Sequence, residues 1–218
     1  MLEVKRVDQT EEEQLERLKE WWSKNGKFVI AGLVVGLASV VGMRLWTETR
    51  NSEAEAASQQ YEQLLGLVGQ GNFGQAEQIA GTLLTEYSST PYASLAKLML
   101  AKIKLEQGDR VAAATFLRQV MDNSGQDEIR EIARLRLARV LLADGKADAA
   151  LSVIEGAELP AIQADAEIIK GDIYLAQGKR AEARAAYERA MVLGAENRRL
   201  LQMKLDDLAM ASGDVAAQ

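Results

Sequence analysis

One uninterrupted apolar stretch constrains this chain more than any other feature of its sequence. From Phe28 to Met43, sixteen consecutive residues carry no charge, and Lys27 and Arg44 bracket them. Extended to 26–46, the stretch gives about 31 Å of helix at roughly 1.5 Å per residue, which matches the hydrocarbon thickness of a bilayer. It is apolar on every face, whereas a core helix of a soluble domain is usually amphipathic. We therefore expect residues 26–46 to cross the lipid bilayer as a single helix.

The flanks of this stretch indicate an uncleaved anchor with its N-terminus in the cytoplasm. All three tryptophans, Trp21, Trp22 and Trp46, fall at its two ends, where indoles favour the membrane interface. A cleavable signal peptide is disfavoured because residues 1–27 carry seven acidic side chains and no A-x-A pattern ends the run. Residues 1–27 also hold six basic residues, whereas the twenty after Met43 hold two. The rest of the chain would then be exported, to the periplasm in a Gram-negative cell.

Small residues form a stripe within the expected span. Gly32 and Gly36 make a G-x-x-x-G pair, which Ala38, Ser39 and Gly42 extend. Such a stripe lets a second helix approach closely, so Gly32 and Gly36 are candidates for transmembrane packing. The alternative is that the motif has no partner, since glycine is common in transmembrane helices.

Composition argues against several classes of function. The chain has no histidine and no cysteine, which removes imidazole bases, thiolate chemistry, disulfides and the usual zinc ligands. No glycine-rich phosphate loop, S-x-x-K or G-x-S-x-G motif occurs. Glu167 and Asp172 lie near each other on an expected helix, where we expect them to solvate an exposed face. We expect no enzyme, cofactor or metal site, and the net charge of −6 argues against nucleic acid as a partner.

A recurring turn sets the architecture after the span. Turns occur at Gly71, Gly108, Gly145 and Gly178, spaced 37, 37 and 33 residues apart, and an alanine follows each glycine by five positions. A period in this range is typical of helical-hairpin repeats. Glycine would end the first helix of each pair in a left-handed conformation, and alanine would let the second helix pack closely against it.

The last unit fixes the register of a tetratricopeptide repeat. Ala101 and Ala138 take the place of Gly171 in the second and third units, whereas the first unit has Leu64 there and is degenerate. The small, aromatic, turn, small, aromatic and small positions of the last unit are, in order, Gly171, Tyr174, Gly178, Ala183, Tyr187 and Ala190. The helix pairs are expected at 54–70/72–87, 92–107/109–123, 128–144/146–156 and 161–177/179–193.

A final helix at about 195–212 reads as the polar cap that a solenoid needs. Its apolar side would carry Leu200, Leu201, Met203, Leu205 and Leu208. The sequence therefore predicts an all-α chain in which a single N-terminal transmembrane helix precedes a tetratricopeptide-like solenoid. Its expected parts are a cytoplasmic segment at 1–25, the span at 26–46, a juxtamembrane helix or linker at 47–60, with helix favoured, and a periplasmic repeat domain at 61–218.

The first helices of the pairs would line a concave surface that can hold another protein. Two recurrent inward positions give the candidate protein-binding surface. The first is apolar throughout, and some of it could instead be core between helices. The pattern of Lys and Asn with which some tetratricopeptide domains clamp a C-terminal carboxylate is missing, which disfavours an acidic peptide tail as ligand. The first position holds Tyr61, Leu98, Leu135 and Ile168, and the second holds Leu65, Lys102, Arg139 and Asp172.

The layout of the whole chain resembles the YfgM family. The features that carry the resemblance are W-W-x-x-x-G at Trp21, Trp22 and Gly26, a glycine-rich span ending in R-L-W at 44–46, and about four tetratricopeptide-like repeats. The resemblance implies an ancillary subunit of the SecYEG translocon in the bacterial inner membrane, with periplasmic repeats. It also implies association with PpiD, a membrane-anchored periplasmic chaperone, and a role in passing exported client proteins to chaperones.

Two functions of different classes are consistent with these features. The first is a membrane-tethered scaffold that docks on the translocon and its chaperone. The second is an adaptor whose cytoplasmic segment restrains a stress-response regulator, because Glu11 to Leu18 could form a small amphipathic docking helix.

Overall fold

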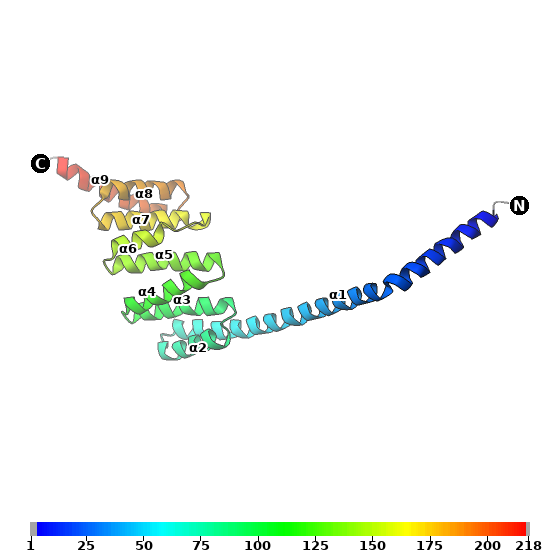
Figure 1. Ribbon diagram of the computed structural model, residues 1–218. Helices are drawn as coiled ribbons and strands as arrows, with labels where there is room; N and C mark the ends of the chain where they lie inside the picture. Colours follow the sequence, from blue (N-terminus) through cyan, green and yellow to red (C-terminus); the bar gives the residue numbers. More distant parts are fainter. Residues whose placement is uncertain (1–3, 217–218) are drawn as a thin grey trace. The chain divides into compact units, whose positions relative to one another are not determined.

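Helices are the regular elements of the described chain. The computed structural model describes the backbone of residues 4–216 and the side chains of residues 13–209 (Figure 1). The chain divides into two compact units, Met1–Ser52 and Glu53–Gln218. The elements are α1 (Val4–Gly69), α2 (Phe73–Glu86), α3 (Pro91–Glu106), α4 (Arg110–Asn123), α5 (Asp127–Ala143), α6 (Ala147–Ile154), the 3-10 helix η1 (Pro160–Ile162), α7 (Gln163–Ala176), α8 (Arg180–Val192) and α9 (Arg198–Ala216).

The first unit contains the apolar stretch, in α1. The side chains of residues 28–46 are exposed throughout, with large apolar groups on all sides of the helix. Trp22 packs over Gly26, and the Arg50 guanidinium lies 4.7 Å from the centre of the Trp46 ring. This is the one helix among the described residues that is long and apolar enough to cross a membrane. Residues 47–60 are helical as well, and the limits of the span itself remain a prediction.

The second unit confirms the expected helical repeat. Its helices stack in chain order (Figure 1), and each packs mainly on the helix before and after it. Their ends lie within a few residues of the expected pairs, with two exceptions: the first helix is the last part of α1, which begins at Val4, and a 3-10 turn at Pro160–Ile162 begins the fourth pair. Local signals set these ends: Pro91 occupies the first turn of α3, and the Asp109 carboxylate accepts the Ala112 N–H at 2.9 Å to cap α4.

The four expected turn glycines have the expected conformation. Gly71, Gly108, Gly145 and Gly178 have φ between 72° and 81°, in the left-handed region. The residue after each glycine donates its N–H to the carbonyl five positions earlier, as from Asp109 to Lys104 at 2.8 Å. These bonds satisfy carbonyls that the end of the helix leaves free. Gly194, with φ of 84°, makes a fifth turn of this kind before α9, which the repeat spacing did not predict.

Each helix pair has one buried position on the first helix and another sixteen residues later on the second. In the fourth pair these are Gly171 and Tyr187, and in the second pair Ala101 and Leu117. The third pair has Ala138 and Ile154, and all of these residues are buried. The first pair reverses the sizes, with Leu64 and Ala80 in one buried cluster. The first unit therefore has both positions filled as in the other repeats, with the large residue on the first helix and the small one on the second.

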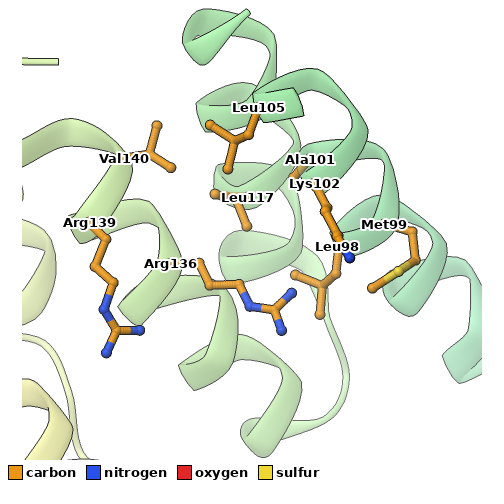
Figure 2. A pocket seen from close by; sticks show the side chains of 9 residues that line it. All are labelled: Leu98, Met99, Ala101, Lys102, Leu105, Leu117, Arg136, Arg139 and Val140. Carbon is orange, nitrogen blue, oxygen red and sulfur yellow. The ribbon is translucent and has the colours of Figure 1, made fainter. Parts of the chain in front are cut away.

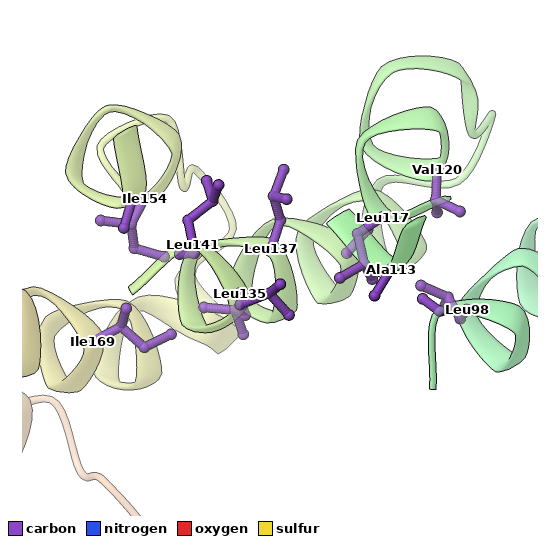
Figure 3. Close-up of a cluster of buried hydrophobic side chains, with 14 of the residues drawn as sticks. Leu98, Ala113, Leu117, Val120, Leu135, Leu137, Leu141, Ile154 and Ile169 are labelled. Atoms are coloured by element: carbon purple, nitrogen blue, oxygen red, sulfur yellow. The ribbon is translucent and has the colours of Figure 1, made fainter. Parts of the chain in front are cut away.

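Buried side chains run through the repeats in three clusters. The largest joins α3 to α7 and includes Leu98, Leu117 and Leu135 (Figure 3). A second cluster covers the first pair and α3, and a third joins α8 to α9 through Tyr187 and Leu201. A continuous core made by neighbouring units explains why no single hairpin needs to be stable alone.

The apolar side of α9 differs from its prediction. Leu201, Leu205 and Leu208 pack on the solenoid, as expected, but Leu200 and Met203 are exposed. The packed residues recur at intervals of four and three, so they follow one face of the helix, and the other two lie off that face. The side chains after residue 209 lie outside the described ones.

Candidate functional site

A pocket on the repeat domain gathers several of the predicted residues. It lies between α3, α4 and α5 and has a volume of about 360 Å³. We call it the α3–α5 pocket, and Figure 2 shows its side chains. Apolar groups form most of its wall, and three cationic side chains join them. It is lined by Leu98, Met99, Ala101, Lys102, Leu105, Leu117, Arg136, Arg139 and Val140.

The apolar part of this pocket comes from core residues and from one leucine that the domain leaves uncovered. Leu98, Leu117 and Val140 are buried and hold the three helices together. Leu105 is 41% exposed, although it lies in the last turn of α3. The pocket thus presents apolar surface to solvent on a rigid base, which is how binding sites for side chains are usually built.

The cationic part of the pocket has few internal partners. Arg139 lies 3.6 Å from Asp165, and both side chains are more than half exposed, so this ion pair is weak. Within the described residues, neither Lys102 nor Arg136 makes a hydrogen bond or an ion pair. Burial raises the pKa of the Tyr61 hydroxyl above its ordinary value of 10.0, although the Arg136 guanidinium acts in the opposite direction. The pocket is therefore locally positive on a chain whose net charge is −6.

A second pocket, of about 390 Å³, lies at the start of α7 and at the turn between α8 and α9. Asp165 and Ile168 contribute from α7, and Leu193 and Glu196 from the turn. Its wall is more polar than that of the α3–α5 pocket. Asp165 thus stands between the two pockets, because it also pairs with Arg139.

The first predicted position is divided between core and surface. Leu98 is 3% exposed and Leu135 is 7% exposed, so in the two middle repeats this position is mainly core between helices. Tyr61 and Ile168 are half-buried. The Tyr61 ring contacts Tyr92, with ring centres 5.8 Å apart and a tilt of 47°. A ligand-facing role for these residues stays a prediction.

The second predicted position is more accessible. Leu65 is 43% exposed, and Lys102 and Arg139 are exposed on the rim of the α3–α5 pocket. Asp172 differs, because its carboxylate accepts the Tyr187 hydroxyl at 2.6 Å and also pairs with Lys204. It joins α7 to α8 and α9. Whether these four residues contact a partner stays a prediction.

The expectation that Glu167 and Asp172 only solvate an exposed face is wrong. Glu167 is 7% exposed and lies between Lys170 at 2.8 Å and Arg189 at 2.7 Å. Burial by itself would raise the pKa of Glu167, but hydrogen bonds from these two cations hold its pKa below its ordinary value. The acids face inward because α8 covers that side of α7, and a residue's own helix does not reveal which helix covers it.

Arg136 and Leu105 are the exposed residues of this pocket that the sequence did not predict. Arg136 follows Met99 by 37 residues, which is the spacing between Gly108 and Gly145. Applying this repeat period to every position of α3 and α5 would have placed Arg136 beside the residues that the repeat already matched, at the position equivalent to Met99.

Gly32 and Gly36 lie on the exposed part of α1, with open space where a side chain would be, and their packing role stays a prediction. Within residues 13–209, no three acidic side chains gather closely enough to hold a metal ion.

Comparison with known proteins relates the chain to one group. Residues 19–210 match the family described as "Tetratricopeptide repeat-like domain". The chain is 33% identical over 199 residues to a protein of Aggregatibacter actinomycetemcomitans named "Ancillary SecYEG translocon subunit", covering 91% of this chain and 97% of that protein. It is 29% identical over 213 residues to the Escherichia coli K12 protein of the same name, covering 94% and 99%. A Neisseria gonorrhoeae protein with this name is 31% identical over 212 residues, with 91% and 97% covered.

Proposed function

Because the chain belongs to the YfgM family of tetratricopeptide repeat-like proteins, we propose that it is a membrane-anchored scaffold associated with the SecYEG translocon. In this proposal, residues 1–25 lie in the cytoplasm, residues 26–46 span the inner membrane, and the repeat domain lies in the periplasm. The function is binding rather than catalysis.

One observation carries the proposal: the same chain has an apolar helical segment, residues 28–46, whose side chains are exposed, and a repeat domain with an accessible pocket. The apolar side chains of residues 28–46 have no cover in their own unit, so a bilayer or another transmembrane helix would have to provide it. The repeat domain presents the α3–α5 pocket. Anchoring restricts the domain to the membrane surface, which raises its local concentration near a membrane channel.

The finer part of the proposal concerns the partners. We propose that the repeat domain contacts the membrane-anchored chaperone PpiD and exported client proteins as they leave the channel. The names of the relatives support SecYEG as the site of assembly. The contact with chaperone and clients rests on the family resemblance and on the exposed inward residues Leu65, Lys102 and Arg139.

Site-specific photo-crosslinking in intact cells tests this function. A photoreactive amino acid would replace Lys102, Arg139 or Leu65, and the same replacement at Arg118, an exposed residue outside the pocket lining, serves as the control. We expect adducts with Sec subunits, PpiD or exported proteins from the inward positions and fewer from the control. If no position captures any of these proteins, the proposal is wrong.

Protease treatment of spheroplasts tests the orientation independently. The repeat domain should be digested from outside while the cytoplasmic membrane is intact, and residues 1–25 should be protected. Protection of the repeat domain would place it in the cytoplasm and exclude every periplasmic partner.

A second function has one observation in its favour. Leu15 and Leu18 are exposed on the N-terminal part of α1, three residues apart, and could dock on a cytoplasmic regulator. The side chains of Glu11 and Glu12, at the start of the expected docking segment, lie outside the described ones. Deletion of residues 1–20 separates the two functions, because translocon association should survive it and regulator binding should not.

A further inference from the structure

We propose that the α3–α5 pocket binds an internal segment of a partner protein in which a large apolar side chain lies between carboxylates. The inference deepens the proposed function, since it names the kind of segment that the scaffold would hold. It rests on three features of the pocket: exposed apolar surface, cations of which two have no carboxylate partner within residues 13–209 and the third has a weak one, and the position of both on neighbouring repeats.

The apolar surface fits a side chain of leucine or phenylalanine size. Leu98, Leu117 and Val140 form a rigid base, and Leu105 is exposed beside them. In the view of Figure 2, Leu105, Leu117 and Val140 lie on one side of the guanidinium groups of Arg136 and Arg139. A partner's apolar side chain that covered Leu105 would remove apolar surface on both molecules from water, which is the main source of affinity at such sites.

The cations select the charge of the flanking residues. Lys102 projects from α3 and Arg136 from α5, and within residues 13–209 no carboxylate pairs with either. Arg139 has only the exposed Asp165, a contact that a ligand carboxylate can replace. Guanidinium groups bind carboxylates through two parallel hydrogen bonds, so an acidic segment gains specificity as well as attraction. A basic segment would be repelled here, although the whole chain carries a net charge of −6.

The arrangement favours an internal segment over a chain end or a lipid. Lys102 projects from α3, and Arg136 and Arg139 project from α5, so carboxylates before and after an apolar side chain can each pair with a cation. A single C-terminal carboxylate would use one of them, and the Lys and Asn clamp for such an end is missing. A lipid acyl chain needs a site that buries most of its surface. This pocket instead opens beside four exposed residues, Lys102, Leu105, Arg136 and Arg139.

The test measures peptide binding to the purified full-length chain in detergent, by fluorescence anisotropy. The probe is a labelled, C-terminally amidated peptide with a Leu-Phe pair between two Asp-Glu pairs. Three comparison peptides have lysines in place of the acids, serines in place of the apolar pair, or a free C-terminal carboxylate. We expect the acidic apolar probe to bind about tenfold more tightly than the first two, more weakly at high salt, and as tightly as the third.

Matched variants assign the binding to this pocket. Lys102→Glu and Arg136→Glu should each weaken the probe about tenfold, and Leu105→Ser should weaken it through loss of apolar contact. Arg118→Glu makes the same charge change on an exposed residue of α4 outside the pocket lining and should have no effect. All four residues are exposed, so circular dichroism should report unchanged folding.

Several results would overturn the inference. These are equal binding of all peptides, binding that needs the free carboxylate, or no difference between the pocket variants and Arg118→Glu. Binding of phosphatidylglycerol vesicles that the pocket variants abolish, without peptide binding, would assign the pocket to lipid instead. The assay contains no translocon, so its failure leaves the proposed translocon association untouched. Peptide binding without crosslinking to Sec components would refute only the latter.

Discussion

Replacing Gly171 by alanine should destabilise the fourth repeat, although alanine normally stabilises a helix. A side chain at this position would place its Cβ 2.8 Å from Cζ of Tyr187 and closer still to Cδ1 and Cε1. Tyr187 is fully buried, and its hydroxyl donates to Asp172, so the ring cannot move aside easily. Burial and this hydrogen bond also raise the pKa of the Tyr187 hydroxyl.

The size of the effect follows from two opposing contributions. Overpacking a well-packed core costs about 1–3 kcal/mol, and exchange of glycine for alanine inside a helix gains about 1 kcal/mol. We expect Gly171→Ala to lower the free energy of unfolding by up to about 2 kcal/mol. Tyr187→Leu should lower it by about 2–3 kcal/mol, since the ring leaves a space and Asp172 loses a donor.

The double variant gives the decisive comparison. Gly171→Ala with Tyr187→Leu reproduces the pairing of Ala101 with Leu117 in the second repeat, which the fold already accommodates. With leucine at position 187, the alanine at position 171 should fill space instead of colliding with a ring. Adding Gly171→Ala to the Tyr187→Leu variant should therefore restore part of its stability. The coupling between the two sites should be about 2 kcal/mol, within the range for residues in contact.

Urea unfolding followed by circular dichroism measures these values on the full-length chain. Hydrogen exchange should show the loss concentrated in α7 and α8, because repeats depend mainly on their neighbours. Additive effects of the two substitutions, within about 0.5 kcal/mol, would refute the packing argument. If α2 and α3 lost as much protection from hydrogen exchange as α8, the expectation of a local effect would be wrong.

Three further predictions use the same measurements. Gly178→Ala should destabilise by about 1–2 kcal/mol because alanine disfavours a φ of 76°, whereas Gly81→Ala, in the open middle of α2, should stabilise by up to about 1 kcal/mol; equal effects would contradict the role of the turn. Because the pKa of Glu167 is lowered in the folded chain, the ionised carboxylate contributes its full stabilisation above the ordinary pKa of 4.5, and this stabilisation is lost as the pH falls below that value. The Glu167→Gln variant should therefore be less stable than the original chain at pH 7, and its free energy of unfolding should change less with pH in acid. The contact of Lys104 with Glu77, at 2.7 Å, should show a coupling of less than about 1 kcal/mol in a double-mutant cycle, since both side chains are partly exposed; a coupling above 2 kcal/mol would show that it acts as a buried pair.

Features that depend on local chemistry, or on a period along the chain, follow from the amino-acid sequence. The apolar stretch, extended to 26–46, is long enough for a bilayer, and the turn glycines have left-handed conformations because a helix end requires them. The repeat spacing also gave the buried alanines, such as Ala113 and Ala183. Each of these signals is contained in a few neighbouring residues or recurs at a constant interval.

Contacts between side chains of different helices depend on how the helices pack. Glu167 is paired with Arg189, and Asp172 with Lys204, at separations that follow no repeat period. The exchange of sizes between Leu64 and Ala80 concealed a complete first repeat, because the packing fixes the sum of two volumes and not either residue. The α3–α5 pocket likewise exists because neighbouring repeats leave Leu105 and Arg136 uncovered. Whether a side chain is exposed depends on how the helices pack, so it cannot be read from the sequence of one helix.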